Sequence, residues 1–136
     1  MMEPNLQLAP VPKKQLWTGR ILSGLAVAFL IFDVVIHIMS PPVVVQGFTD
    51  LGYSPSLARP LGIIELACLI LCLIPRTSVL GAVLLTGYLG GAVATNLRVA
   101  APLLSNTLFP IYVALFLWGG LVLRNDRLRT VFPLQE

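Results

Sequence analysis

Four apolar runs, each close to the length that crosses a lipid bilayer, constrain this chain more than any other feature. They span residues 17–39, 60–74, 78–99 and 107–123, and prolines or basic residues separate them. A membrane-spanning helix needs roughly 20 mainly apolar residues, because it rises about 1.5 Å per residue through a hydrocarbon layer about 30 Å thick. The sequence therefore predicts an all-α, transmembrane four-helix bundle.

Composition leaves no room for a soluble domain. Of the 136 residues, 57% are hydrophobic and 11% are charged, whereas a soluble domain has about 25% charged residues. We expect one transmembrane domain over residues 15–129, a disordered tail over residues 1–14 and a short tail over residues 130–136. A secretory signal peptide is an alternative for the first run, but its apolar core would be only about 7–15 residues long.

The segment between the first two runs, residues 43–57, is more polar. Val44, Phe48 and Leu51 have helical spacing, and Gly52 is suited to end a helix. This pattern predicts a short helix on the membrane surface, and an irregular loop remains the alternative.

Basic residues are distributed unequally between the two sides of the predicted bundle. With both termini cytoplasmic, the outer flanks hold only Arg59 and Arg98, and the inner flanks hold Lys13, Lys14, Arg20, Arg76, Arg124, Arg127 and Arg129. Cytoplasmic loops carry an excess of Lys and Arg, so both termini are predicted to be inside. The net charge of +3 follows this topology and indicates no nucleic-acid partner.

Two carboxylates, Asp33 and Glu65, interrupt otherwise apolar spans. Counting from the predicted outer helix ends, both lie about 8–9 Å below the outer surface, at 1.5 Å per residue. His37 follows Asp33 by one helical turn, and Asn96 lies near the outer end of the third span. Because acids facing lipid are costly, we expect both to turn inward and meet His37 and the outer arginines.

This clustering predicts a polar site that opens outward. Asp33 and Glu65 are the candidate acid–base residues, because neighbouring buried carboxylates tend to retain a proton. The candidate binding residues are His37, Arg59, Tyr88, Asn96 and Arg98. A purely structural ion network is the alternative. No metal site is predicted, because one histidine and two acids on different helices have no recognised ligand spacing.

Two further patterns concern packing. Cys68 and Cys72 lie one turn apart without a Cys-x-x-Cys motif, so they are predicted to be packing residues rather than a redox pair. Gly87 and Gly91 form a GxxxG motif, which lets another helix approach closely. We expect this contact to lie inside the bundle.

Several motifs together resemble the DoxX-like family of small bacterial membrane proteins. They are Gly-Ile-Ile-Glu-Leu-Ala at 62–67, Ile-Pro-Arg-Thr at 74–77, and Leu-Thr-Gly-Tyr-Leu-Gly-Gly-Ala-Val-Ala-Thr-Asn-Leu-Arg at 85–98. Phe-Pro-Ile-Tyr at 109–112 and Trp-Gly-Gly-Leu at 118–121 continue the likeness. The resemblance implies a four-helix membrane bundle in the bacterial cytoplasmic membrane, although relatives often have histidine where this chain has Asn96.

Wider relatives in this family are associated with quinone or thiosulfate oxidation and with thiol-stress complexes. The resemblance therefore implies a quinone- or isoprenoid-like lipophilic small molecule as the ligand of the predicted site. No motif for a nucleotide, flavin or haem is visible, so the sequence identifies no cofactor, and quinone is the one candidate. The alternatives are a non-catalytic accessory subunit of a membrane redox complex and a small transporter. The expected partners are the lipid bilayer, the small molecule, and either a redox protein or a second copy of the chain.

Overall fold

A computed structural model of the protein describes residues 10–131, and its elements are all helical. They are α1 (Lys13–Met39), α2 (Pro42–Asp50), η1 (Pro55–Leu57), α3 (Ala58–Leu73), α4 (Ser78–Arg98), η2 (Leu103–Thr107), α5 (Phe109–Arg124) and α6 (Asp126–Val131). Four helical stretches are long and apolar enough to cross a membrane: Lys13–Met39, Pro55–Leu73, Ser78–Arg98 and Leu103–Arg124. The predicted fold class is confirmed, and the protein is a multi-pass membrane protein.

The helix ends differ from the predicted boundaries at both ends of the chain. The first helix begins at Lys13, four residues before the predicted start of the span. After the last span, residues 126–131 form the short helix α6, with Leu128 buried in the core. The rest of the two predicted tails, residues 1–9 and 132–136, lies outside the described residues.

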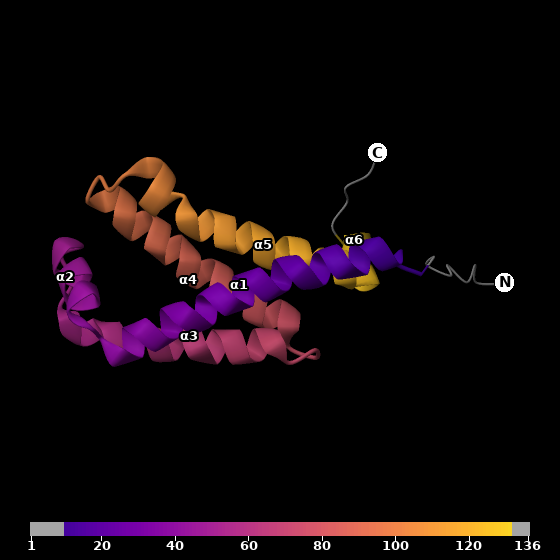
Figure 1. The fold of residues 1–136 in the computed structure, drawn as a ribbon, viewed down its shortest axis with the longest axis horizontal. Coiled ribbons are helices and arrows are strands. Elements are labelled where there is room, and N and C mark those ends of the chain that lie inside the picture. The colour runs from indigo at the N-terminus through magenta and orange to yellow at the C-terminus, as the bar shows by residue number, and fades with distance from the viewer. Residues whose placement is uncertain (1–9, 132–136) are drawn as a thin grey trace.

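The four long helices form a bundle in which α1 and α4 each pack against both α3 and α5. The start of α1 lies beside α6 at one end of the molecule, and α2 lies at the other end (Figure 1). We refer to these as the α6 end and the α2 end. Toward the α2 end, α4 and α5 diverge from α1 and α3 (Figure 1). The bundle is therefore more open there.

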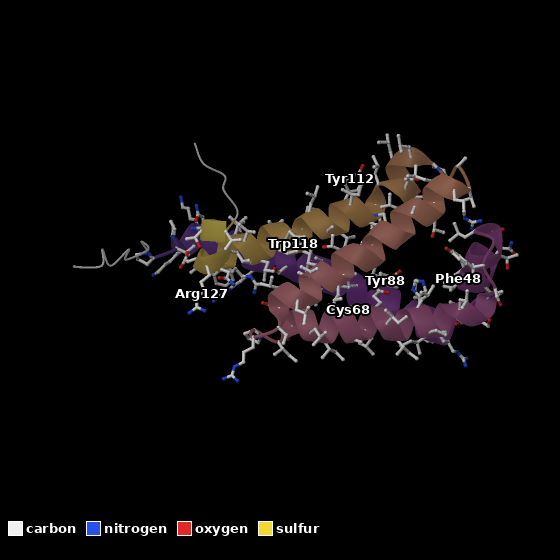
Figure 2. The ribbon with its side chains drawn as sticks, turned by 180° about the vertical axis from the view of Figure 1, so that it is seen from behind. Phe48, Cys68, Tyr88, Tyr112, Trp118 and Arg127 are labelled. Carbon is white, nitrogen blue, oxygen red and sulfur yellow. The ribbon has the colours of Figure 1, made fainter. Side chains whose placement is uncertain are left out.

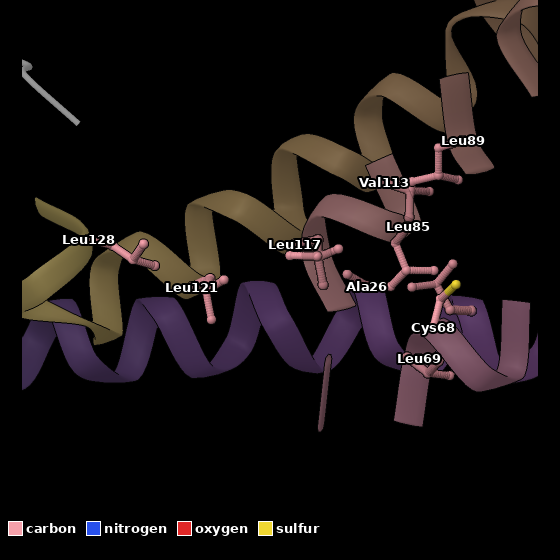
Figure 3. Packing of buried hydrophobic residues seen from close by; sticks show 11 residues of the cluster. Ala26, Cys68, Leu69, Leu85, Leu89, Val113, Leu117, Leu121 and Leu128 are labelled. Carbon is pink, nitrogen blue, oxygen red and sulfur yellow. The ribbon is translucent and has the colours of Figure 1, made fainter. Parts of the chain in front are cut away.

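The centre of the bundle is apolar. Leu30, Leu69 and Leu85 are at most 1% exposed, and they pack with residues from all four long helices, including Ala26 and Leu117 (Figure 3). Large apolar side chains also cover the outer faces, among them Phe32, Ile63, Leu84 and Leu115. A soluble protein would not expose so much apolar surface, whereas a bilayer solvates it without penalty.

Glycines bring α1 and α5 together near the α6 end. A Cβ atom on Gly19 would lie 3.0 Å from the Gly120 carbonyl oxygen, and one on Gly120 would lie 2.7 Å from the Gly19 carbonyl oxygen. Two helix backbones can approach this closely only when neither carries a side chain at the contact. These glycines set the spacing of α1 and α5.

The segment after α1 is helical, as the spacing of its apolar residues predicted. Val44 and Phe48 of α2 are buried, and they pack with Ala58 of α3. The helix ends at Asp50, and Gly52 follows with a positive φ of 76°. The loop alternative is therefore wrong, and α2 closes one side of the α2 end, where Figure 2 labels Phe48.

Substituting Gly120 by Ala should destabilise the bundle by about 1–3 kcal/mol, because the added methyl overlaps the backbone of α1. Gly119→Ala is the matched control, since its Cβ would meet only Leu22 Cδ1 at 3.6 Å, an ordinary contact. Thermal unfolding of both variants in detergent, followed by circular dichroism, measures the difference. Equal stability of the two variants would contradict the proposed helix contact.

Candidate functional site

A cavity of about 620 Å³ opens between the helices at the α2 end. Its polar lining includes Asp33, His37, Tyr88, Thr95 and Asn96, which come from α1 and α4. The rest of its wall is mainly apolar and aromatic, including Phe29, Phe48, Leu61, Leu89, Phe109 and Val113. Four of the predicted site residues therefore line one cavity, and Arg59, Glu65 and Arg98 do not.

His37 is oriented by the turn of α1 that precedes it. Its Nδ1 lies 2.7 Å from the backbone carbonyl oxygen of Asp33 and 3.4 Å from Asp33 Oδ2. A carbonyl oxygen only accepts hydrogen bonds, so Nδ1 donates and carries the proton. In the neutral imidazole, Nε2 therefore keeps its lone pair.

Close packing of α3 against α1 holds this pair in place. A Cβ atom on Gly62 would lie only 2.8 Å from His37 Cβ, so the absence of a side chain at Gly62 lets α3 approach. The His37 ring also meets Phe48 of α2 edge-on, with 5.6 Å between ring centroids. The imidazole is thus enclosed from two sides.

Glu65 lies behind the cavity wall and does not line it. Its side chain is fully buried, and neither carboxylate oxygen has a hydrogen-bond partner among the described residues. The Asp33 carboxyl group and the Tyr88 hydroxyl are its polar neighbours. Burying an ionised carboxylate without a hydrogen-bond partner costs free energy. A bound proton or a cation would have to offset this cost.

The three titratable groups come together although they belong to two helices. One oxygen each of Asp33 and Glu65 and one ring nitrogen of His37 all lie within 4.8 Å of one another. Sequence spacing gave no sign of a metal site because α1 supplies two of these groups and α3 supplies the third.

Neither outer arginine joins this cluster, which corrects the prediction that they neutralise the acids. The Arg98 guanidinium donates to the Leu51 carbonyl oxygen and lies over the Tyr53 ring, 5.6 Å from its centroid. Arg59 Nε donates to the Ile38 carbonyl oxygen, at 3.2 Å. Carbonyls at a helix end and in the following loop lack partners within a helix, so they attract these donors.

The GxxxG motif does not form the helix contact that the sequence predicted. A Cβ atom on Gly87 or Gly91 would find nothing within 4 Å, and both residues line the cavity instead. The missing side chains therefore create space rather than close packing. Tyr88, between them in sequence, lies on the inner side of α4 in Figure 2.

The cysteines belong to the packing of the bundle. Cys68 is buried in the apolar core, Cys72 packs against that core, and both thiols are free. This placement agrees with the predicted packing role.

A second cavity, of about 770 Å³, lies at the α6 end and was not predicted. Its lining includes Arg20, Ser23, Ser78 and Arg124. Arg124 Nη2 donates to Ser23 Oγ at 2.9 Å, so polar groups also meet inside the bundle at this end. Ser23 and Arg124 each follow a glycine of the close contact between α1 and α5 by one helical turn.

Comparison with known proteins identifies the family of the chain. A sequence model of the DoxX-like family matches residues 21–120. This range includes all three members of the carboxylate–histidine cluster and every residue that lines the cavity at the α2 end. No curated protein and no solved structure matches the chain. Since the matched region covers well over half of the sequence, the protein belongs to the DoxX-like family.

Proposed function

We propose that the protein binds a small lipophilic molecule with a polar head, of the quinone- or isoprenoid-like class, in the cavity at the α2 end. The observation that carries the proposal is the composition of the cavity wall. Small-molecule sites are typically hollows of about 300–1,000 Å³ with mainly apolar walls and a few convergent polar groups. The volume of about 620 Å³ and the lining described above fit this description.

The polar head would sit against α1 and α4. Asp33, His37 and Tyr88 supply hydrogen-bonding groups on one part of the wall. Asn96 Nδ2 donates to the Ala92 carbonyl oxygen at 2.9 Å, which orients the amide and leaves its oxygen as an acceptor. These groups would fix the orientation of the head, and they would contribute specificity more than affinity.

The apolar body of the ligand would pack against aromatic side chains of α1 and α5. Phe29 and Phe109 meet edge-to-face, with 4.8 Å between ring centroids, and both line the cavity. The distribution of Lys and Arg favours the α2 end as the outer side of the bacterial cytoplasmic membrane. The ligand would then enter from the outer leaflet.

Asp33 would be the acid–base group at the head of the ligand, because it lines the cavity. Glu65 lies behind it and would act through Asp33 rather than by touching the ligand. Proton exchange between the two carboxyl groups would require no rearrangement of the helices, since they are already neighbours.

The arrangement of the two cavities favours a binding site over a transport pathway. Leu30, Leu69 and Leu85 line neither cavity and fill the centre of the bundle between them. A transporter would have to part this core in each cycle, whereas binding at the α2 end leaves it intact.

Filling the cavity from α4 tests the location of the site. Gly91→Leu should weaken binding of a short-chain quinone probe by about 5-fold to 150-fold, because overpacking costs about 1–3 kcal/mol. Gly90→Leu is the matched control: a Cβ there is equally unobstructed, but Gly90 does not line the cavity. Equilibrium dialysis in detergent gives both dissociation constants, and equal constants would place the ligand elsewhere.

Removing one hydroxyl group tests where the polar head lies. Tyr88→Phe should weaken binding of the same probe by roughly threefold to tenfold, the value of one hydrogen bond of about 0.5–1.5 kcal/mol. Tyr112→Phe is the control, because Tyr112 lies outside the cavity and projects from α5 (Figure 2). If Tyr112→Phe weakens binding as much as Tyr88→Phe does, the assigned orientation of the ligand is wrong.

A further inference from the structure

We infer that Asp33, His37 and Glu65 form a binding site for one first-row divalent metal ion, of the Zn²⁺ or Mn²⁺ class. The metal would occupy the junction of α1 and α3 at the cavity wall. This inference goes beyond the small-molecule site and does not require it. With the metal bound, Asp33 and Glu65 would be its ligands in place of the acid–base role proposed above, and Tyr88 and Asn96 would still face the molecule in the cavity.

The geometry of the three donors is close to that of a metal site. The candidate ligand atoms lie within 4.8 Å of one another. Nitrogen and oxygen ligands bind Zn²⁺ at about 2.0–2.2 Å, so two of them in a tetrahedral site are roughly 3.4 Å apart. Reaching that spacing would take a contraction of up to about 1.4 Å and a turn of the His37 ring. The ring has to turn because the nitrogen that lies 3.4 Å from Asp33 Oδ2 is Nδ1.

Charge gives the second and independent argument. Both oxygens of Glu65 are buried without a hydrogen-bond partner, and Asp33 lies beside them. The arginines that could have balanced this pair bind backbone carbonyls elsewhere. Buried carboxylates are normally paired or bound to metal, and a divalent cation would neutralise two of them at once.

The orientation of His37 agrees with a ligand role. Its Nδ1 donates to the Asp33 carbonyl oxygen at 2.7 Å, which leaves Nε2 unprotonated. A metal-binding histidine usually donates its other ring N–H to a carboxylate or a backbone carbonyl, and this bond fixes the tautomer. The close contact of Gly62 with His37 Cβ keeps α3, and with it Glu65, beside this ring.

The donor set selects the class of ion. One imidazole nitrogen and two carboxylate oxygens suit Zn²⁺, Mn²⁺ or Fe²⁺, whereas Ca²⁺ and Mg²⁺ prefer sites made entirely of oxygen. Asp33 and His37 line the cavity, so an ion can reach the site through it. Three protein ligands would leave an open coordination position.

Cobalt provides a direct test, because Co²⁺ occupies zinc-type sites and its visible absorption reports its coordination. The full-length protein, purified in detergent and stripped with a chelator, should bind one Co²⁺ per chain with visible bands that Zn²⁺ abolishes. Glu65→Gln and His37→Phe should each weaken binding by about 100-fold or more, since each removes a ligand. Asp50→Asn, which alters an exposed carboxylate of α2 bonded to Gln46, should bind normally.

Stability measurements separate loss of metal from loss of fold. Without metal, Glu65→Gln should be about as thermostable as the unsubstituted protein, because glutamine keeps the size of this buried side chain and carries no charge. With Co²⁺ present, only the unsubstituted protein and Asp50→Asn should gain thermostability. A destabilised Glu65→Gln variant in metal-free buffer would contradict the charge argument.

The inference is overturned if the stripped protein binds no stoichiometric Co²⁺, or if binding survives in both ligand variants. The first outcome would mean that protons, rather than a metal, neutralise the two acids. Gly91→Leu distinguishes this inference from the proposed function: it should lose the quinone probe and keep Co²⁺. Loss of both ligands together in that variant would refute the separation of the two sites.

Discussion

The organisation of this protein depends on two carboxylates held together at the junction of α1 and α3. Asp33 and Glu65 are neighbours in a bundle whose buried core consists of leucine, alanine, valine and cysteine. In hydrocarbon no water solvates such a pair, so the side chains and helices around it must accommodate the two carboxyl groups. A side chain at position 62 would keep α3 away from His37. His37 in turn donates to the backbone of the preceding helical turn, and Asp33 lines the cavity while Glu65 lies behind it.

The features that depend on one-dimensional patterns could be predicted from the sequence. Hydropathy gives the four spans, and the spacing of Val44 and Phe48 gives α2, because periodicity records which face of a helix is buried. Counting residues from the helix ends also brought Asp33 and Glu65 to the same depth, since the rise of a helix is constant. These inferences needed no knowledge of the neighbours of any side chain.

The hydrogen-bond partners of the outer arginines could not be predicted in this way, because several acceptors compete for each guanidinium group. Arg98 could have paired with a carboxylate, but it donates to the carbonyl oxygen of Leu51, which the end of α2 places beside it. Arg59 likewise donates a hydrogen bond to the carbonyl oxygen of Ile38, at the end of α1. A sequence shows that an arginine lies at the right depth, but it does not show which acceptor lies closest to its head group.

The sequence likewise does not show whether a glycine lies in a helix contact or beside a cavity. This difference also accounts for the position of the cavity at the α2 end. Gly19 and Gly120 face each other, so their missing side chains bring α1 and α5 into backbone contact near the α6 end. Gly87 and Gly91 face no helix, so their missing side chains widen the cavity at the α2 end. The same residue type therefore brings two helices into contact at one end of the bundle and leaves space between helices at the other. The width of this cavity is set on α4 by the absence of side chains at Gly87 and Gly91, and a larger residue at either position would reduce it.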